Sequence, residues 1–152
     1  MFLRLFVICF LSLMFVGCFK DSPQNSASTR NSSQDILQNN ISVEDRLKKA
    51  FNSHESGFEI EVSATVIKVL ADDNEGSRHQ KFLIKLSSGQ TILVSHNIDL
   101  ASRVENLKAG DQVKIYGQYE WSEKGGTIHW THHDPHAHHT DGWIEREGQK
   151  YQ

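Results

Sequence analysis

The sequence predicts a mainly β domain in which five strands close into a barrel, with a short helix before the first strand and another between the third and fourth strands. Three observations lead to this fold class. Apolar and polar residues alternate in five stretches from Phe58 to His133, a helical segment separates the third stretch from the fourth, and the alternation changes parity within the first. A long first strand with such a slip can bend and let a sheet curl.

The short N-terminal helix is predicted to begin at Ser42 and to end before Gly57. Ser42 is a typical cap residue, and Asp45 stands three positions later as in a capping box. The apolar residues that follow fall on one helical face, namely Val43, Leu47, Ala50 and Phe51. We expect that face to pack on the domain, because a short amphipathic helix usually contributes to a core.

The first strand starts at Phe58 and alternates as far as Val66. Ile67 and Val69 then continue the alternation with the opposite parity. A β-bulge produces this change of phase, so we expect one near Val66.

The second and third strands are predicted as a hairpin of residues 79–86 and 91–97, joined by a turn at 87–90. Pairing about a turn centred near Gly89 places His79 beside the end of the third strand. His79, His96 and Asn97 therefore gather at one end of the sheet, and we expect them to contribute to a ligand-binding site.

The region from residue 99 to 107 is predicted as the second short helix, and the last two strands as a hairpin of residues 113–121 and 127–133. Pairing about Lys124 sets Ile128 opposite Trp121, Trp130 opposite Tyr119, His132 opposite Gly117 and His129 opposite Glu120. This order of elements matches a five-stranded OB-fold barrel, with an up-and-down sandwich as the alternative.

Residues 1–17 predict a secretory signal peptide. A short start containing Arg4 precedes an apolar run that is shorter than the roughly 20 residues needed to span a bilayer. Gly17-Cys18 resembles a bacterial lipoprotein cleavage site, and Cys18 is the one cysteine left once the signal is removed. We therefore expect residues 18–40 to be a lipidated cysteine and flexible tether, and residues 41–152 the barrel domain. The alternative is an ordinary signal peptide followed by a coincidental cysteine.

This reading predicts a protein anchored through lipid to a membrane of the bacterial cell envelope and facing the periplasm. Loss of residues 1–17 removes one charge, that of Arg4, and changes the formal net charge from −3 to −4. Strong nucleic-acid binding is not expected of an acidic chain, because that binding needs many cations to neutralise phosphates. A metal cation, a basic small ligand or another envelope protein suits the charge better.

The stretch from Gly125 to Ile144 holds six of the nine histidines and two of the three tryptophans. The imidazoles there predict a transition-metal site, most simply for Zn²⁺ or another divalent ion. His129 and His133 lie about 13 Å apart on a straight strand, so one site requires the chain to fold back at Asp134-Pro135. The predicted metal ligands are His129, His132, His133, Asp134 and His139, and Glu120 and Trp130 are further ligand-binding candidates. The alternative is a polar scaffold in which His129 binds Glu120 and Asp134 caps the turn.

Several segments carry a family resemblance, namely His79-Gln80-Lys81-Phe82, residues 96–101, Gly117-Gln118-Tyr119-Glu120, His129-Trp130-Thr131-His132-His133-Asp134-Pro135 and Gly142-Trp143-Ile144. From about Val62 onward the chain resembles a family of uncharacterised bacterial envelope proteins with a domain of unknown function. The resemblance implies that the predicted metal ligands fall on motif positions, whereas His136 and His138 do not. It implies no activity.

Two functions follow from these residues. The first is a binding module that uses the histidine-rich segment for a small ligand or a metal. The second is a metal-dependent, Zn-type hydrolase, including a nuclease-like one, because His129 with Glu120 resembles a base and its orienting carboxylate. No activated serine or cysteine nucleophile accompanies them.

Overall fold

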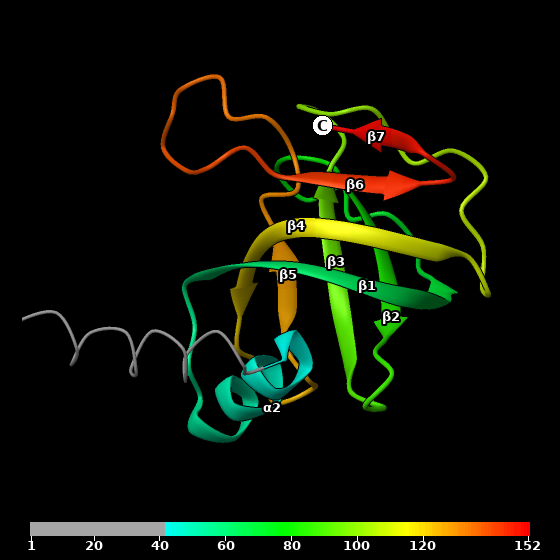
Figure 1. Cartoon of the computed structure of the whole chain (residues 1–152). Coiled ribbons are helices and arrows are strands. Elements are labelled where there is room, and N and C mark those ends of the chain that lie inside the picture. The colour runs from blue at the N-terminus through cyan, green and yellow to red at the C-terminus, as the bar shows by residue number, and fades with distance from the viewer. Residues whose placement is uncertain (1–41) are drawn as a thin grey trace, which may run out of the picture.

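The structure is a computed structural model and describes residues 42–152 (Figure 1). The described chain forms one helix and seven strands: α2 (Val43–Ser53), β1 (Phe58–Val69), β2 (His79–Lys85), β3 (Thr91–Asn97), β4 (Gln112–Glu120), β5 (Thr127–His129), β6 (Trp143–Arg146) and β7 (Gln149–Tyr151). The predicted signal peptide, Cys18 and the tether lie outside these residues. Among residues 42–152, no helix is long and apolar enough to cross a membrane.

Five of the strands close into a barrel. The hydrogen-bonded order is β1-β2-β3-β5-β4-β6-β7, and a further pairing of β1 with β4 completes the circle. The pairings are antiparallel except that of β3 with β5, which is parallel. The expected mainly β, five-stranded barrel is thus confirmed, and its strand order is consistent with an OB-like fold.

The bend in β1 is what lets this strand pair on both sides. Its first part pairs with β4, from Phe58 opposite Tyr119 to Thr65 opposite Gln112. Its last part pairs with β2, and the register shifts between Val66 and Lys68. The β-bulge expected near Val66 is therefore present.

Alternate side chains of the strands fill the barrel. The largest fully buried apolar side chains are Tyr119, Phe82, Leu47, Ile84, Ile92, Ile115, Ile128 and Ile144. The predicted alternation puts the residues of this list that belong to β2, β3, β4 and β5 inside, whereas Ile144 lies on β6. The intervening residues of β2, β3 and β5 lie on the outer face.

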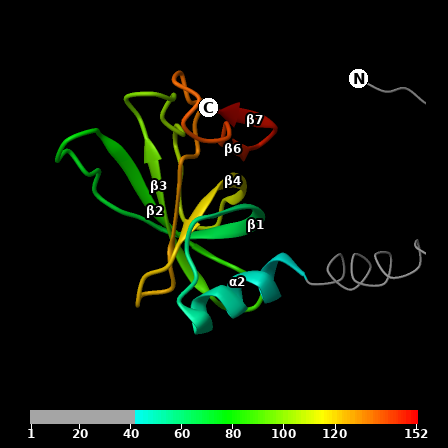
Figure 2. The same ribbon diagram turned by 90° about the vertical axis from the view of Figure 1, so that its left-hand side faces the viewer.

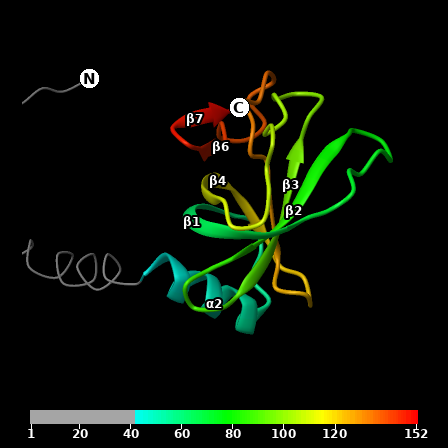
Figure 3. The same ribbon diagram turned by 90° about the vertical axis from the view of Figure 1, so that its right-hand side faces the viewer.

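Helix α2 lies at one end of the barrel, and the segment between β5 and β6 lies at the opposite end (Figures 2 and 3). The Ser42 hydroxyl accepts a hydrogen bond from the Asp45 N–H at 3.0 Å, as the capping prediction requires. Leu47 and Ala50 are fully buried against the core. The helix ends at His54, which has the left-handed φ of 56° typical of a C-terminal cap.

The predicted helix at residues 99–107 is wrong, because this segment forms turns and irregular chain. The buried Gln80 side chain occupies both backbone groups of Val104: its Oε1 accepts from the Val104 N–H and its Nε2 donates to the Val104 carbonyl, both at 3.0 Å. The Asn97 side chain accepts from the Asp99 N–H at 2.9 Å. These bonds replace the helical ones, so the apolar spacing here reflects burial of an irregular segment.

The final hairpin also differs from the prediction. The turn closes with the Gly125 N–H donating to the Ser122 carbonyl at 3.1 Å, so Ile128 faces Tyr119 rather than Trp121. β5 ends at His129 instead of His133, and a hairpin of β6 and β7 that was not predicted pairs with β4. Glu147 and Gly148 connect that hairpin with positive φ at both positions, as tight two-residue turns require.

Candidate functional site

The outer face of β2, β3 and β5 forms the floor of a pocket, and the segment from residue 130 to 139 forms its wall. The side chains of His79, Ser95, Asn97 and His129 alternate with inward-facing neighbours and so share this outer face. The pocket has a volume of about 390 Å³. Its lining consists of Ser77, His79, Ser95, Asn97, Leu100, His129, Trp130, His132, Asp134, Pro135, His136, His138 and His139.

The wall segment leaves the barrel because the chain is forced out of the strand at Trp130. This residue has a φ of 51°, which is rare for a bulky side chain and breaks the ladder. Two glycines make room for the departing backbone. A Cβ on Gly117 would collide with the His129 carbonyl, and a Cβ on Gly142 would collide with the Trp130 carbonyl. Thr131, rather than the predicted His132, stands over Gly117.

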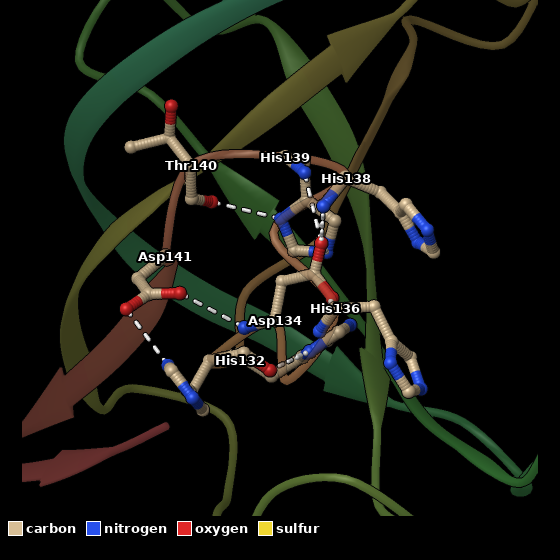
Figure 4. Close-up of polar contacts among 8 residues, drawn as sticks. His132, Asp134, His136, His138, His139, Thr140 and Asp141 are labelled. Carbon is tan, nitrogen blue, oxygen red and sulfur yellow. Dashed lines mark hydrogen bonds and ion pairs between the residues drawn. The ribbon is translucent and has the colours of Figure 1, made fainter.

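Two carboxylates hold the wall segment in shape (Figure 4). The Asp134 carboxylate accepts from the backbone N–H groups of His136 and His139 at 2.9 Å each, and also from that of His138. Asp141 accepts from the Asp134 N–H at 2.9 Å and from the His133 ring at 2.8 Å. Asp134 therefore caps the turn, as the scaffold alternative expects.

The environment of Asp134 makes it a stable anion. Burial alone raises the pKa of this carboxyl, but the three backbone donors more than offset that effect and lower its pKa to about 2. The pKa of Asp141 is also lowered, first by the Asp134 N–H and then by the His133 ring. Both oxygens of Asp134 are engaged with the loop backbone, so this carboxylate orders the segment.

Aromatic rings continue from the barrel into the wall segment. The indole of Trp130 stacks on the His129 ring at 4.8 Å and on the His139 ring at 4.6 Å between centroids. His132 meets His139 edge-on at 5.0 Å. Trp130, the single tryptophan of the pocket, thus contacts two imidazoles. These stacking contacts hold the rings in position although no hydrogen bond joins them.

His129 has an unusual polar environment. Among residues 42–152, its Nε2 is the one buried side-chain nitrogen or oxygen without a hydrogen-bond partner. The nearest carboxylate oxygen, Glu120 Oε1, is 3.8 Å away and accepts instead from Gln118 Nε2 at 2.6 Å. Burial lowers the pKa of His129, Glu120 partly opposes this, and the neighbouring rings of His139 and His79 lower it further. The ring is therefore neutral near pH 7.

His96 lies beneath the pocket floor and is fully buried. Its Nδ1 is 2.8 Å from the Thr131 hydroxyl, and its Nε2 is 3.1 Å from the Ser102 carbonyl. Burial lowers the pKa of this imidazole, chiefly by disfavouring its charged form. With both nitrogens engaged, His96 joins β3 to the two segments that border the pocket.

The structure brings together most of the residues that the sequence singled out. His79, Asn97, His129, Trp130, His132, Asp134 and His139 line the pocket, whereas His96, Glu120 and His133 lie outside its lining. The His133 side chain is 61% exposed and turns to Asp141. In their present conformations, no group of three or more metal-ligating side chains within residues 42–152 is arranged to hold an ion.

Other lining residues were missed by sequence reasoning. Ser77 and Ser95 carry no motif. The pairing of β2 with β3 could have placed Ser95 only, because Ser77 precedes β2. His136 and His138 fall outside the motif positions that the resemblance implies, yet both line the pocket, with exposed rings 5.5 Å apart. Their alternation with Ala137 was the available signal.

Comparison with known protein families identifies the family of this chain. A family model described as "Protein of unknown function (DUF3465)" matches residues 33–152, which confirms the resemblance to an uncharacterised family. The match begins within the stretch predicted to be a tether. No curated protein matches the chain.

Proposed function

We propose, from the premise that this chain belongs to the DUF3465 family of proteins of unknown function, that its barrel is a binding module of the bacterial cell envelope. The module is anchored to a membrane through lipid on Cys18 and faces the periplasm. It binds a small ligand or a divalent transition metal in the histidine-lined pocket. The signal sequence and the Gly17-Cys18 site support the address.

The observation that carries this proposal is the unpaired Nε2 of His129 in a pocket lined by six imidazoles. A buried polar atom without a partner costs roughly 1–3 kcal/mol. A ligand that donates to, accepts from or coordinates this nitrogen removes that cost. His129 therefore has a nitrogen free to bind a ligand. His96 has none, because both of its ring nitrogens already have partners within the protein.

The pocket favours a polar or metallic ligand over a large apolar one. Neutral imidazoles offer both a donor and an acceptor, and they are common ligands of Zn²⁺ and similar ions. Asn97, Ser77 and Ser95 add neutral polar groups, and Trp130 adds one aromatic surface. The alternative partner is another envelope protein that inserts a polar side chain there.

Blocking the pocket tests the proposal without changing a histidine. The mature protein, extracted in detergent, is screened by thermal unfolding against Zn²⁺, Ni²⁺, phosphate, acetate and glucose. A bound ligand at about 100 times its Kd adds about 2.7 kcal/mol to the free energy of unfolding. We expect at least one compound to raise the Tm of the wild type but not that of Ser95→Trp.

Ser63→Trp is the matched control, because Ser63 is an exposed position on β1 outside the pocket lining. This variant should respond like the wild type. Equal shifts in Ser95→Trp and Ser63→Trp, or no shift with any compound, would contradict the proposal.

A metal-dependent hydrolase is the second candidate, and one observation favours it. The Glu120 carboxylate is fixed by Gln118 and lies 3.8 Å from the buried His129 nitrogen, so a small movement would pair base and carboxylate. This function requires hydrolysis of a phosphodiester or ester probe that stops on chelation and returns with Zn²⁺. If Glu120→Gln hydrolyses the probe as fast as the wild type, His129 and Glu120 are not the catalytic pair.

A further inference from the structure

The imidazoles of the pocket differ in which ring nitrogen is already engaged. Nδ1 of His79, His132 and His139 lies 2.8 Å from a backbone carbonyl oxygen in each case. The carbonyls belong to Ser77, His133 and Thr140. A carbonyl only accepts, so each Nδ1 carries the proton and donates it.

This arrangement fixes the tautomer of all three rings. When Nδ1 holds the proton of a neutral imidazole, Nε2 presents its lone pair. Among residues 42–152, none of the three Nε2 atoms has a hydrogen-bond partner, and the contact of His139 Nε2 with Asp134 is 3.9 Å long. His79, His132 and His139 line one pocket, so three free lone pairs belong to one cavity.

The same pattern prepares histidines for metal binding. A metal-ligating imidazole usually donates its other N–H to a backbone carbonyl or a carboxylate, and this bond sets its orientation and raises its basicity. Three histidines with a fourth position open for water or a ligand are an established coordination set for Zn²⁺. Oδ2 of Asp134 lies 3.9 Å from Nε2 of His139, so an acidic side chain already stands beside one of the three nitrogens.

The other histidines lack one of these features. Both nitrogens of His96 are engaged, and His133 directs its Nδ1 to Asp141 outside the pocket lining. The rings of His136 and His138 make no hydrogen bond to residues 42–152 that would hold their orientation. His129 stacks on Trp130 and has no carbonyl partner for its ring.

We propose that the pocket binds one divalent transition-metal ion of the Zn²⁺ class through Nε2 of His79, His132 and His139. The assignment rests on the proposed binding function and narrows it to a metal with a defined ligand set. It drops His129, His133 and Asp134 from the set predicted from the sequence and adds His79, which comes from a distant strand. The three rings do not yet surround a common point, so binding requires the chain segments that carry them to move closer together, each with its own Nδ1–carbonyl contact intact.

The first test measures which ring nitrogens are protonated and which bind metal in the mature, detergent-extracted protein. Histidine ring ¹⁵N signals are recorded after chelation and again with one equivalent of Zn²⁺. We expect Nε2 of these three rings to shift on metal binding while their Nδ1 atoms stay protonated. Coordination through Nδ1, or shifts confined to His136 and His138, would overturn the assignment.

Variants give the second test through calorimetric titration with Zn²⁺. His79→Ala, His132→Ala and His139→Ala should each weaken the affinity for Zn²⁺ by more than the roughly 10–100-fold that loss of an outer-shell partner costs. His54→Ala, at the end of α2, and His133→Ala are matched controls, because both residues lie outside the pocket lining, and they should bind within a few-fold of the wild type. Equal loss in a control variant would overturn the ligand set. Because the nitrogen signals come from the wild type, the test stands even where a variant fails to fold.

The outcomes separate this inference from the proposed function. If Zn²⁺ does not bind but phosphate, acetate or glucose raises the Tm in a Ser95-dependent manner, the metal assignment fails and the binding module stands. If nothing binds in a Ser95-dependent manner, both fail.

Discussion

At the scale of single residues, Asp134 determines the form of the pocket wall. Its buried carboxylate accepts three backbone N–H groups within five residues of chain, and Asp141 in turn holds the Asp134 N–H. A charged acceptor with several backbone donors is stronger than a neutral one. The histidines of the segment are therefore presented by a backbone that one side chain orders.

Asp134→Asn tests this role. An amide is uncharged and has a single acceptor oxygen, so all three backbone donors lose their charged partner and at least one loses its acceptor. We expect faster amide hydrogen exchange at residues 136, 138 and 139, together with a lower Tm. Ser95→Ala, which alters the pocket floor but none of these bonds, serves as control. Unchanged exchange in Asp134→Asn would contradict the role.

The buried His96 makes the free energy of unfolding depend on pH. Its folded-state pKa is lowered below 6.5 by burial, with further lowering from His132 and His79, while the Ser102 and Thr131 contacts raise it. Below pH 6.5 the unfolded chain then binds more protons than the folded chain. The contribution of His96 to the free energy of unfolding is therefore present above that pH and is lost as the pH falls.

We therefore expect the free energy of unfolding to fall more between pH 7.5 and pH 5.5 in the wild type than in His96→Gln. Urea denaturation at the two pH values measures both differences. The variant will start from a lower stability, so the comparison concerns the change with pH. An equal or larger change in His96→Gln would show that the buried imidazole does not carry this linkage.

At the scale of elements, the strands were predictable because burial imposes a period of two. β1 to β4 lie close to their expected positions, and even the bulge was visible as a change of parity at Val66. The conformation of residues 99–107 was not predictable, because their apolar spacing suits a helix as well as a loop buried on one side. Only the three-dimensional structure reveals that Gln80 takes the backbone groups of Val104.

Gln80→Leu tests that explanation. Leucine fits an apolar core but leaves both the N–H and the carbonyl of Val104 without partners. Each buried unpaired group costs roughly 1–3 kcal/mol, so we expect a clear loss of unfolding free energy by urea denaturation. Gln112→Leu, at an exposed position of β4, should change stability by no more than about 0.5 kcal/mol. Similar effects of the two substitutions would refute the account.

Part of the candidate site could also be predicted. The bend at Asp134-Pro135 and the gathering of His79 and Asn97 at one sheet end follow from turn chemistry and strand register. The exit of the chain at Trp130 could not be foreseen, because a positive φ at a tryptophan has no sequence signal. That exit turns His133 away from the pocket and brings His136 and His138 to it.

At the scale of the whole molecule, the barrel separates two ends with different roles. α2 covers one end, and the segment between β5 and β6 lies toward the other (Figures 1 and 2). That segment supplies the wall of the histidine-lined pocket. A lipid on Cys18 would join the chain on the N-terminal side of α2. The proposed anchoring would thus hold the module at a membrane while a separate region binds the ligand.

Cys18→Ala tests the anchor. Without the cysteine thiol there is no site for lipid attachment, so we expect uncleaved precursor that retains residues 1–17 and lacks the lipid. Mass spectrometry of the membrane fraction identifies both species. Normal release of a soluble, processed protein would refute the anchor and favour an ordinary signal peptide. It would leave the barrel and its pocket unaffected.

The central claim is that the pocket binds a divalent transition metal through three specific imidazoles. The most direct measurement is a crystal structure of the Zn²⁺-loaded protein, with the ion located by its anomalous scattering. We expect one strong peak about 2.0–2.1 Å from Nε2 of His79, His132 and His139. A peak held only by His136 and His138, or no ordered peak in the pocket at full zinc loading, would contradict it.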